Sequence, residues 1–239
     1  MQQIDKPAPA RLGAAIVGGI VGALVMAAVL LLAAPQLVGS RIVRAGMMAD
    51  PQILVDAGEA LRGQQYAPVL AQHRAELETP FATSWKGASK PDVTIVEFFD
   101  YACPYCKASN PAIEQLLGED KGLRVVYREL PILGPQSVTA ARLSLAASKA
   151  GRFAQFHDAL WDAGRPAPDT LAAASKAAGL TEPPADSPDI EAELKKNFEL
   201  AGQLGATGTP LFIIGDRVLN SAVSYDELKK AVEDARAKG

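Results

Sequence analysis

The stretch from Val93 to Ala108, VTIVEFFDYACPYCKA, constrains the fold more than any other part of the chain. An apolar run of strand length ends at Asp100-Tyr101, and two cysteines follow at a spacing of three residues. If Cys103 opens a helix, free backbone N–H groups and the positive end of the helix dipole stabilise its thiolate. Cys106 then lies one turn further along, within reach of a disulfide with Cys103. The pattern predicts a strand–helix junction with an exposed nucleophilic thiol and a sheltered resolving thiol.

Three other uses of paired cysteines compete with this interpretation. A structural zinc site needs two more ligands, but the only histidines, His73 and His157, are not at ligand spacing. Covalent haem attachment needs a histidine after the second cysteine, where Lys107 stands. A structural disulfide that joins a single helical turn constrains the unfolded chain very little. Thiol–disulfide exchange is therefore the leading interpretation, and it needs no metal and no cofactor besides the cysteine pair.

Three segments occur in an order that resembles the DsbA-like thiol:disulfide oxidoreductases of the thioredoxin superfamily. They read EFFDYACPYCK, RELPILGPQS and GATGTPLFIIGD. The resemblance runs from about Phe81 to the C-terminus. It implies an α/β thioredoxin-like domain over residues 81–239, with a helical insertion at about residues 137–205.

The resemblance also implies a set of site residues. Cys103 and Cys106 would form the redox-active disulfide, with Pro104 and Tyr105 between them as part of the active-site motif. Thr209 and Pro210 would bind the substrate, with Pro210 as a cis-proline against the cysteines. Proline offers no N–H there, and the Thr209 backbone can pair with an extended peptide. A trans proline that merely starts a strand is the alternative.

Glu97 is a carboxyl group inside the apolar strand. Burial of an unpaired carboxylate costs several kcal/mol, so we expect its pKa to be raised. The resemblance gives Glu97 a catalytic role, because the family carries an acid here beneath the second cysteine to handle its proton. No lysine lies in the next predicted strand, Leu123–Leu130, where some family members pair one with this acid. How Glu97 is balanced stays open.

The N-terminal region predicts a membrane anchor. Residues 12–40 contain no charged side chain and are long enough to cross a bilayer as a helix, with residues 1–11 as a tail. A cleavable signal peptide has a shorter apolar core, of roughly 7–15 residues, so cleavage near Val38-Gly39-Ser40 is the less favoured alternative. Flanking charges do not decide the orientation. Because disulfides persist outside the cytosol, we expect a single-pass protein of the bacterial inner membrane with its catalytic domain in the periplasm.

Residues 41–80 predict a helical linker. Asp50 and Pro51 favour a helix start, and apolar residues then recur at helical spacing at Ile53, Leu54, Ala57 and Leu61. Pro68 is expected to break or kink this helix. One interpretation is a stalk that lies on the catalytic domain. The other is an oligomerisation helix, such as relatives of the ScsC type carry.

The rest of the chain predicts short elements. Phe81–Lys86 reads as an edge strand, and the helix after the cysteines connects two parallel strands. Four helical segments between residues 137 and 205 end at glycines. A hairpin and a last helix, capped by Ser224 and Glu227, close the chain. His157 lies beside an aromatic stripe, so we expect it to be packed.

Composition limits the partners. The 239 residues, 49% of them hydrophobic, allow one good core, and a net charge of −3 provides no basic surface for nucleic acid. We expect partners that are exported proteins with thiols or disulfides, together with a DsbB-like or DsbD-like membrane redox partner. Formation or exchange of disulfides is the favoured function. An isomerase or reductase of the DsbG or ScsC type is the alternative, and a copper-binding protein is less favoured because no Met- or His-rich tract is present.

Overall fold

The structure, a computed structural model, describes residues 22–26, 39–180 and 187–238. The chain divides into two units, residues 1–58 and residues 59–239. Within the first unit, residues 22–26 and 39–49 are helical. The predicted tail of residues 1–11, and most of the predicted anchor of residues 12–40, lie outside the described residues. Among the helices that are described, none has the length and apolar character needed to span a membrane.

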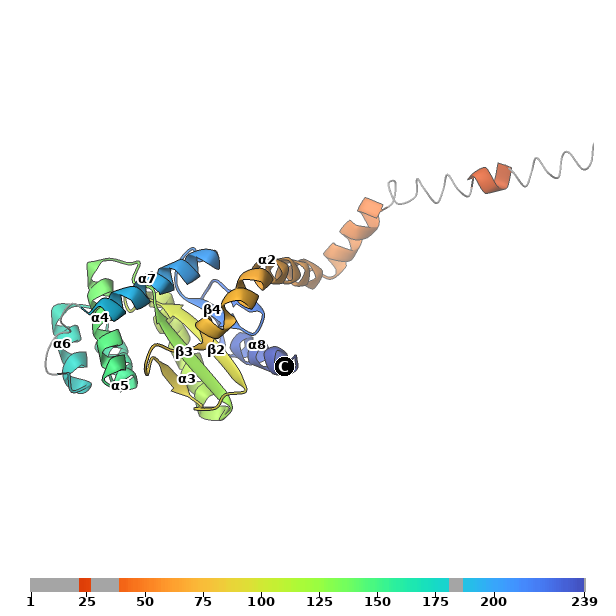
Figure 1. Ribbon diagram of the computed structural model, residues 1–239. Coiled ribbons are helices and arrows are strands. Elements are labelled where there is room, and N and C mark those ends of the chain that lie inside the picture. The colour runs from red at the N-terminus through yellow and green to blue at the C-terminus, as the bar shows by residue number, and fades with distance from the viewer. Residues whose placement is uncertain (1–21, 27–38, 181–186, 239) are drawn as a thin grey trace, which may run out of the picture. The chain divides into compact units, whose positions relative to one another are not determined.

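The second unit is built on a five-stranded sheet of order β1-β3-β2-β4-β5 (Figure 1). The strands are β1 (Trp85–Gly87), β2 (Val93–Phe99), β3 (Leu123–Glu129), β4 (Leu211–Ile214) and β5 (Arg217–Leu219). Only β2 and β3 pair in parallel, and α3 (Pro104–Glu119) connects them. The predicted α/β class and the strand–helix–strand unit around the cysteines are therefore confirmed.

Both faces of the sheet are covered, because alternate residues of β2 and β3 point to opposite sides. One face, which includes Ile95 and Phe99, packs against α3, α5 (Phe153–Ala163) and α8 (Tyr225–Arg236). The other face, which includes Val96 and Phe98, packs against α7 (Pro188–Gln203) and the second half of α2 (Gln52–Glu78). The buried apolar side chains of β2 and β3 therefore divide between two separate cores.

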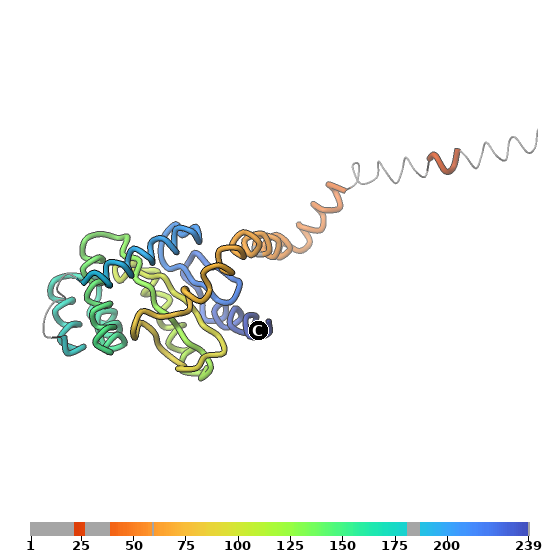
Figure 2. The backbone as a smooth tube through the Cα atoms, viewed as in Figure 1, coloured from red at the N-terminus to blue at the C-terminus, as the bar shows by residue number. Residues whose placement is uncertain are grey.

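The predicted helical insertion is present as four helices. They are α4 (Pro135–Lys149), α5 (Phe153–Ala163), α6 (Pro168–Ala177) and α7 (Pro188–Gln203). Gly151 and Gly179, which follow α4 and α6, have φ angles of 72° and 68°, a conformation that favours glycine. Figure 2 shows α6 and α8 at opposite ends of the domain.

Two local expectations differ from the structure. The edge strand is Trp85–Gly87 rather than Phe81–Lys86, because Phe81 and Thr83 hydrogen-bond to Ser148 of α4 instead of pairing with β3. Helix α2 continues through Pro68, so the proline does not break it, and the expected kink stays a prediction. Packing of Leu70 and Leu77 in the sheet core holds the helix on the far side of the proline.

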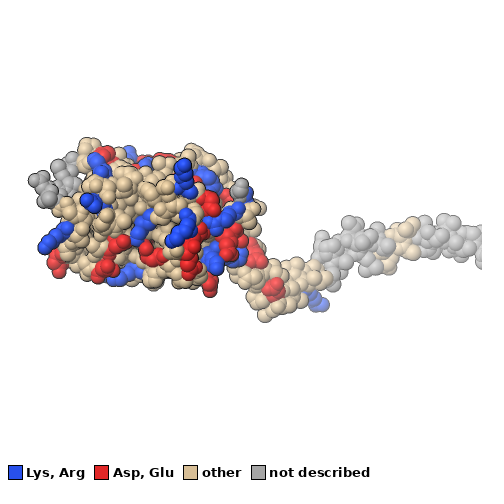
Figure 3. All heavy atoms as spheres, turned by 90° about the horizontal axis from the view of Figure 1, so that it is seen from below, with Lys and Arg blue, Asp and Glu red and all other residues tan. Residues whose placement is uncertain are grey.

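The linker predicted at residues 41–80 is helical over most of its length, and Gln52 N–H donates to Asp50 Oδ1 at 3.1 Å at the start of α2, as expected for an N-terminal cap. Its second half, from Glu59 on, belongs to the second unit, where Leu70 and Leu77 pack in the core of the sheet. On the face seen in Figure 3, basic and acidic side chains are interspersed.

Candidate active site

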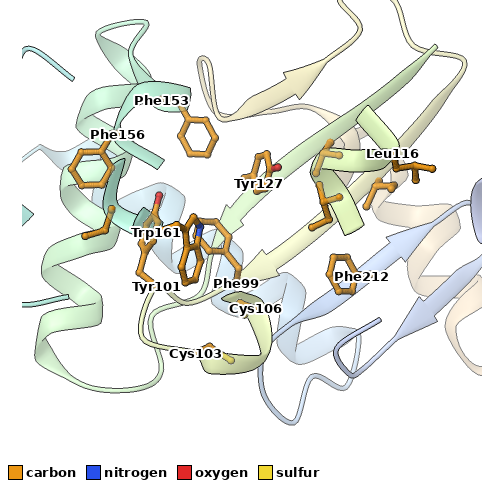
Figure 4. Packing of buried hydrophobic residues seen from close by; sticks show 14 of the residues in the cluster. Phe99, Tyr101, Cys103, Cys106, Leu116, Tyr127, Phe153, Phe156, Trp161 and Phe212 are labelled. Carbon is orange, nitrogen blue, oxygen red and sulfur yellow. The ribbon is translucent and has the colours of Figure 1, made fainter. Parts of the chain in front are cut away.

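The two cysteines lie where β2 passes into α3. Cys103 occupies the N-cap position with extended backbone, and Pro104 is the first residue of the helix. The Cys103 N–H donates to Asp100 O at 2.9 Å, which closes the turn after β2. Both cysteines are free thiols here, which corresponds to the reduced form of the predicted disulfide. Figure 4 shows their side chains beside the aromatic cluster that contains Phe99 and Tyr101.

Cys103, the predicted nucleophile, is less accessible than the sequence indicated. Cys103 is 4% exposed and Cys106 is 0% exposed, whereas Tyr105 between them is 65% exposed. The expected exposed thiol is therefore covered, and its sulfur does not accept a capping hydrogen bond from the helix. Instead the Cys103 S–H donates to the carbonyl oxygen of Thr209 at 3.2 Å.

Thr209 and Pro210 reach the cysteines because β4 pairs with β2. Phe98 lies opposite Leu211, so the residues just before β4 meet the end of β2. The Thr209–Pro210 peptide bond is cis, as the resemblance implied. The Thr209 Oγ1 atom is buried and has no hydrogen-bond partner among the described residues.

Glu97 is buried in the middle of β2, between Tyr127 of β3 and Phe212 of β4. Its Oε1 has no hydrogen-bond partner in the described part of the chain. Burial raises the pKa of Glu97 well above its ordinary value, and the Cys103 sulfur raises it further. Burial also raises the pKa of Cys106, and the charge of Glu97 adds to this effect. The carboxyl and the resolving thiol therefore compete for a negative charge in the same buried region.

No cation of β3 balances Glu97. Tyr127 lies opposite it, and Arg128 belongs to the other face, where its guanidinium binds the carbonyl oxygen of Leu77 and the carboxylate of Glu193. The sequence left open which group balances the charge of Glu97. In β3 the position that faces this acid holds a tyrosine rather than a cation.

Two further residues of the site were missed by sequence reasoning. Asp100 is buried, and its carboxylate accepts N–H bonds from Ala102 at 2.8 Å and from Ile132 and Leu133 at 2.9 Å. An Asp that accepts from the N–H two residues later is a known turn pattern, so this role was readable in part. Glu129 is the second, a buried acid at the end of β3 that carried the same signal as Glu97.

The predicted packing of His157 is confirmed. The ring is buried in α5, and its two nitrogens hydrogen-bond to Tyr101 and Trp161.

Comparison with known families agrees with this geometry. Residues 94–233 match the family described as a DSBA-like thioredoxin domain. The chain belongs to the DsbA-like thioredoxin domain family. With its paired cysteines, this part of the molecule is a DsbA-like thiol–disulfide exchange domain.

Three solved structures resemble the DsbA-like chain closely. A periplasmic thioredoxin-like protein from Salmonella enterica serovar Typhimurium has a TM-score of 0.64 at 32% identity, covering 69% of this chain and 95% of its own. The catalytic domain of Proteus mirabilis ScsC has a TM-score of 0.66 at 29% identity, covering 71% and 98%. The thiol-disulfide exchange protein α-DsbA2 from Wolbachia pipientis has a TM-score of 0.65 at 27% identity, covering 74% and 97%.

Two curated relatives add context. Na(+)/H(+) antiporter NhaA 3 of Salinispora tropica is 31% identical over 161 residues, which are 64% of this chain and 24% of the antiporter. The DsbA-like chain thus spans about a quarter of that relative's length. Disulfide bond formation protein D of Bacillus subtilis is 26% identical over 167 residues, covering 62% of this chain and 74% of its own.

Proposed function

We propose that the DsbA-like protein exchanges disulfides with exported proteins through Cys103 and Cys106. The observation that carries this proposal is the 3.2 Å contact between the Cys103 sulfur and the Thr209 carbonyl. A backbone carbonyl at the end of a strand can pair with an extended peptide. A substrate cysteine bound in that way would lie next to the reactive sulfur.

The proposed reaction has two steps. The Cys103 thiolate attacks a sulfur of the substrate disulfide, which breaks that S–S bond, forms a mixed disulfide and releases one substrate thiolate. Cys106 then loses its proton to Glu97 and attacks the Cys103 sulfur, which forms the Cys103–Cys106 disulfide and releases the second substrate thiolate. The reverse sequence oxidises a substrate dithiol with the same electron count.

Disulfide formation is the favoured direction, and a DsbG- or ScsC-type isomerase or reductase is the alternative. The name of the Bacillus subtilis relative supports formation. We further propose that residues 12–40 anchor the chain in the inner membrane with the catalytic unit in the periplasm. The uncharged run in the sequence and a periplasmic relative support this arrangement. A DsbB-like protein would reoxidise the cysteine pair after disulfide formation, whereas a DsbD-like protein would reduce it if the chain is an isomerase or reductase.

The first prediction concerns the roles of the two thiols. Cys106→Ala should accumulate mixed disulfides with exported proteins, because the second attack is removed, whereas Cys103→Ala should trap none. Reducing and non-reducing gels of each variant, with a metal chelator present, would reveal the adducts. Trapping by Cys103→Ala instead would reverse the roles, and trapping by neither variant would contradict the function. Equilibration of the wild-type chain with glutathione would give the reduction potential and hence the direction.

A further inference from the structure

Glu129 is a second buried acid on the face of the sheet that carries Glu97. In the parallel register Glu97 lies opposite Tyr127, and Phe99 lies opposite Glu129. Residues two apart on a strand share a face, so both carboxyl groups point to the side that packs against α3 and Cys106. Glu129 is 1% exposed, and its Oε1 has no hydrogen-bond partner within the described residues.

A chain of buried hydrogen bonds leads towards Glu129. Trp161 can only donate, and its Nε1–H lies 3.2 Å from His157 Nε2. Burial lowers the pKa of His157 well below its ordinary value, so the ring is neutral and carries its proton on Nδ1. That N–H lies 3.1 Å from the Tyr101 hydroxyl oxygen, and the Tyr101 hydroxyl lies 3.0 Å from Ser144 Oγ.

Each group in this series of hydrogen bonds therefore donates its proton towards Glu129. Tyr101 accepts from His157, so its own proton is donated to Ser144. The Ser144 proton is then available to Glu129, and this hydrogen bond lowers the pKa of Glu129 while burial, the larger effect, raises it. The series of hydrogen bonds that begins at Trp161 of α5 and passes through Ser144 of α4 thus ends on the carboxyl group of Glu129 in β3.

The charges around Glu129 are mostly negative or neutral. Asp100 and Glu97 each raise the pKa of Glu129, and the Asp100 carboxylate is fixed by three main-chain N–H groups. The titratable groups on this face of the sheet are Glu97, Asp100, Tyr101, Cys103, Cys106, Tyr127 and His157, with Lys86 and Asp158 acting from the surface. A negative charge on Glu129 therefore makes a further negative charge nearby, such as that of ionised Glu97, less favourable.

We propose that Glu129 is a positioning residue for the exchange reaction, which acts through Glu97 to set the pH range in which Cys106 transfers its proton. The inference rests on the proposed function. In the resolving step the Cys106 proton moves to Glu97, the Cys103–Cys106 bond forms, and the bond between Cys103 and the substrate breaks to release a thiolate. While Glu129 is neutral, it leaves Glu97 free to ionise and accept that proton. Once Glu129 is ionised, it disfavours negative charge on Glu97, so that less of the Glu97 carboxylate is present to accept the Cys106 proton.

The test compares Glu129→Gln with the wild-type full chain. Glutamine imitates the neutral acid, so both proteins should resolve a Cys103–glutathione mixed disulfide at equal rates at about pH 5. The variant should become faster than wild type by about three- to tenfold as the pH rises to about 8 or 9, because it cannot gain the charge. Stopped-flow measurement of glutathione release gives both rates. Relative to wild type, the equilibrium of Glu129→Gln with glutathione should shift towards the Cys103–Cys106 dithiol over the same pH range.

Matched variants separate this role from a structural one. Glu129→Asp should restore the slower rate at high pH that Glu129→Gln removes. Ser144→Ala should move the onset of this slowing to higher pH, because the hydrogen bond that lowers the pKa of Glu129 is lost. Glu129→Gln should add nothing to Glu97→Gln, since it acts through that residue. Glu114→Gln removes an exposed acid from α3 and should leave the ratio of rates unchanged.

A ratio of variant to wild-type rate that stays constant with pH would overturn the inference. Absence of exchange in the wild type would instead contradict the proposed function, so the two failures are distinguishable. If Glu129→Gln does not fold, infrared difference spectra of the wild-type chain, with the dithiol reduced and oxidised, provide a second measurement, and the Glu97→Gln spectrum identifies the band of Glu97. A second protonated carboxyl band that shifts on reduction in the wild type supports the role of Glu129, and absence of any second shifting band refutes it.

Discussion

At the scale of single residues, the buried carboxyl group of Glu97 makes folding stability depend on pH. Its pKa in the folded state lies above the ordinary value of 4.5, mainly because of burial. The folded state therefore holds this proton more tightly than the unfolded state. The resulting stability is fully present below about pH 4.5 and is lost as the pH rises through the folded-state pKa. Ionisation of Glu97, which the proposed proton transfer requires, therefore lowers the free energy of unfolding.

Glu97→Gln should reverse that cost and slow the reaction. We expect the variant to unfold with a free energy about 1–3 kcal/mol higher than wild type near pH 8, because no buried charge has to form, and with equal free energy near pH 4. Exchange should be slower, because the acceptor of the Cys106 proton is gone. Urea denaturation across pH and peptide exchange rates measure the two effects. An unchanged exchange rate would make Glu97 purely structural.

The sequence predicted those residues whose chemistry is local. The cysteines, the acid within an apolar strand and the proline before β4 could all be found from patterns in the chain. The cover over Cys103 could not, since it depends on a carbonyl that lies 106 residues away in sequence. Glu129 was overlooked although it carried the same signal as Glu97, because its neighbours Ser144 and Asp100 are brought beside it only by the fold.

At the scale of elements, Arg128 fastens α2 to the sheet. Its guanidinium donates to the carbonyl oxygens of Glu76, Leu77 and Thr79 at the end of α2, and to Glu193 and Asn197 of α7. A cation at a helix C-terminus satisfies carbonyl groups that have no partner within the helix. One side chain of β3 thereby joins two helices that are far apart in sequence.

Arg128→Met should show how much this junction contributes. The substitution removes one of the two cations paired with the buried Glu193, since Lys196 remains. It also leaves the carbonyl oxygens of Leu77 and Thr79 without this donor, so we expect a loss of about 2–3 kcal/mol in unfolding free energy. Arg74→Met, which removes half-exposed ion pairs from α2, is the matched control and should cost no more than about 1 kcal/mol. Equal losses for the two variants in urea denaturation would contradict the special role of Arg128. The sequence indicated α2 as a helix but not its partner, because a contact with β3 leaves no periodic signal.

At the scale of the whole molecule, α2 presents exposed apolar side chains. Ile53, Leu54 and Leu61 are 44%, 55% and 66% exposed. Unpartnered apolar residues at helical spacing are typical of a helix–helix interface. These residues support the proposal that chains of this protein associate.

A chain shortened to begin at Arg41 should therefore self-associate, whereas one that begins at Glu59 should be monomeric. Both should oxidise a simple dithiol peptide, but the shorter chain should lose most of any ability to reshuffle scrambled disulfides, which benefits from several sites on one particle. Light scattering at tens of micromolar decides the first point, and a monomeric longer chain would refute association. A cut at Thr79 is unsuitable, because it removes Leu70 and Leu77 from the core.

The carboxylate of Asp100 has a consequence for encounters with other proteins. Its two oxygens tie the segment before Cys103 to the segment after β3, where Ile132 and Leu133 are partly exposed. The two segments are thereby held together before any partner arrives. Ordering a loop upon association reduces affinity through lost conformational entropy, and here that loss has already occurred during folding. Under the proposed function, an exported chain that docks beside Cys103 meets two segments already held in place, so that less of its binding free energy is spent on ordering them.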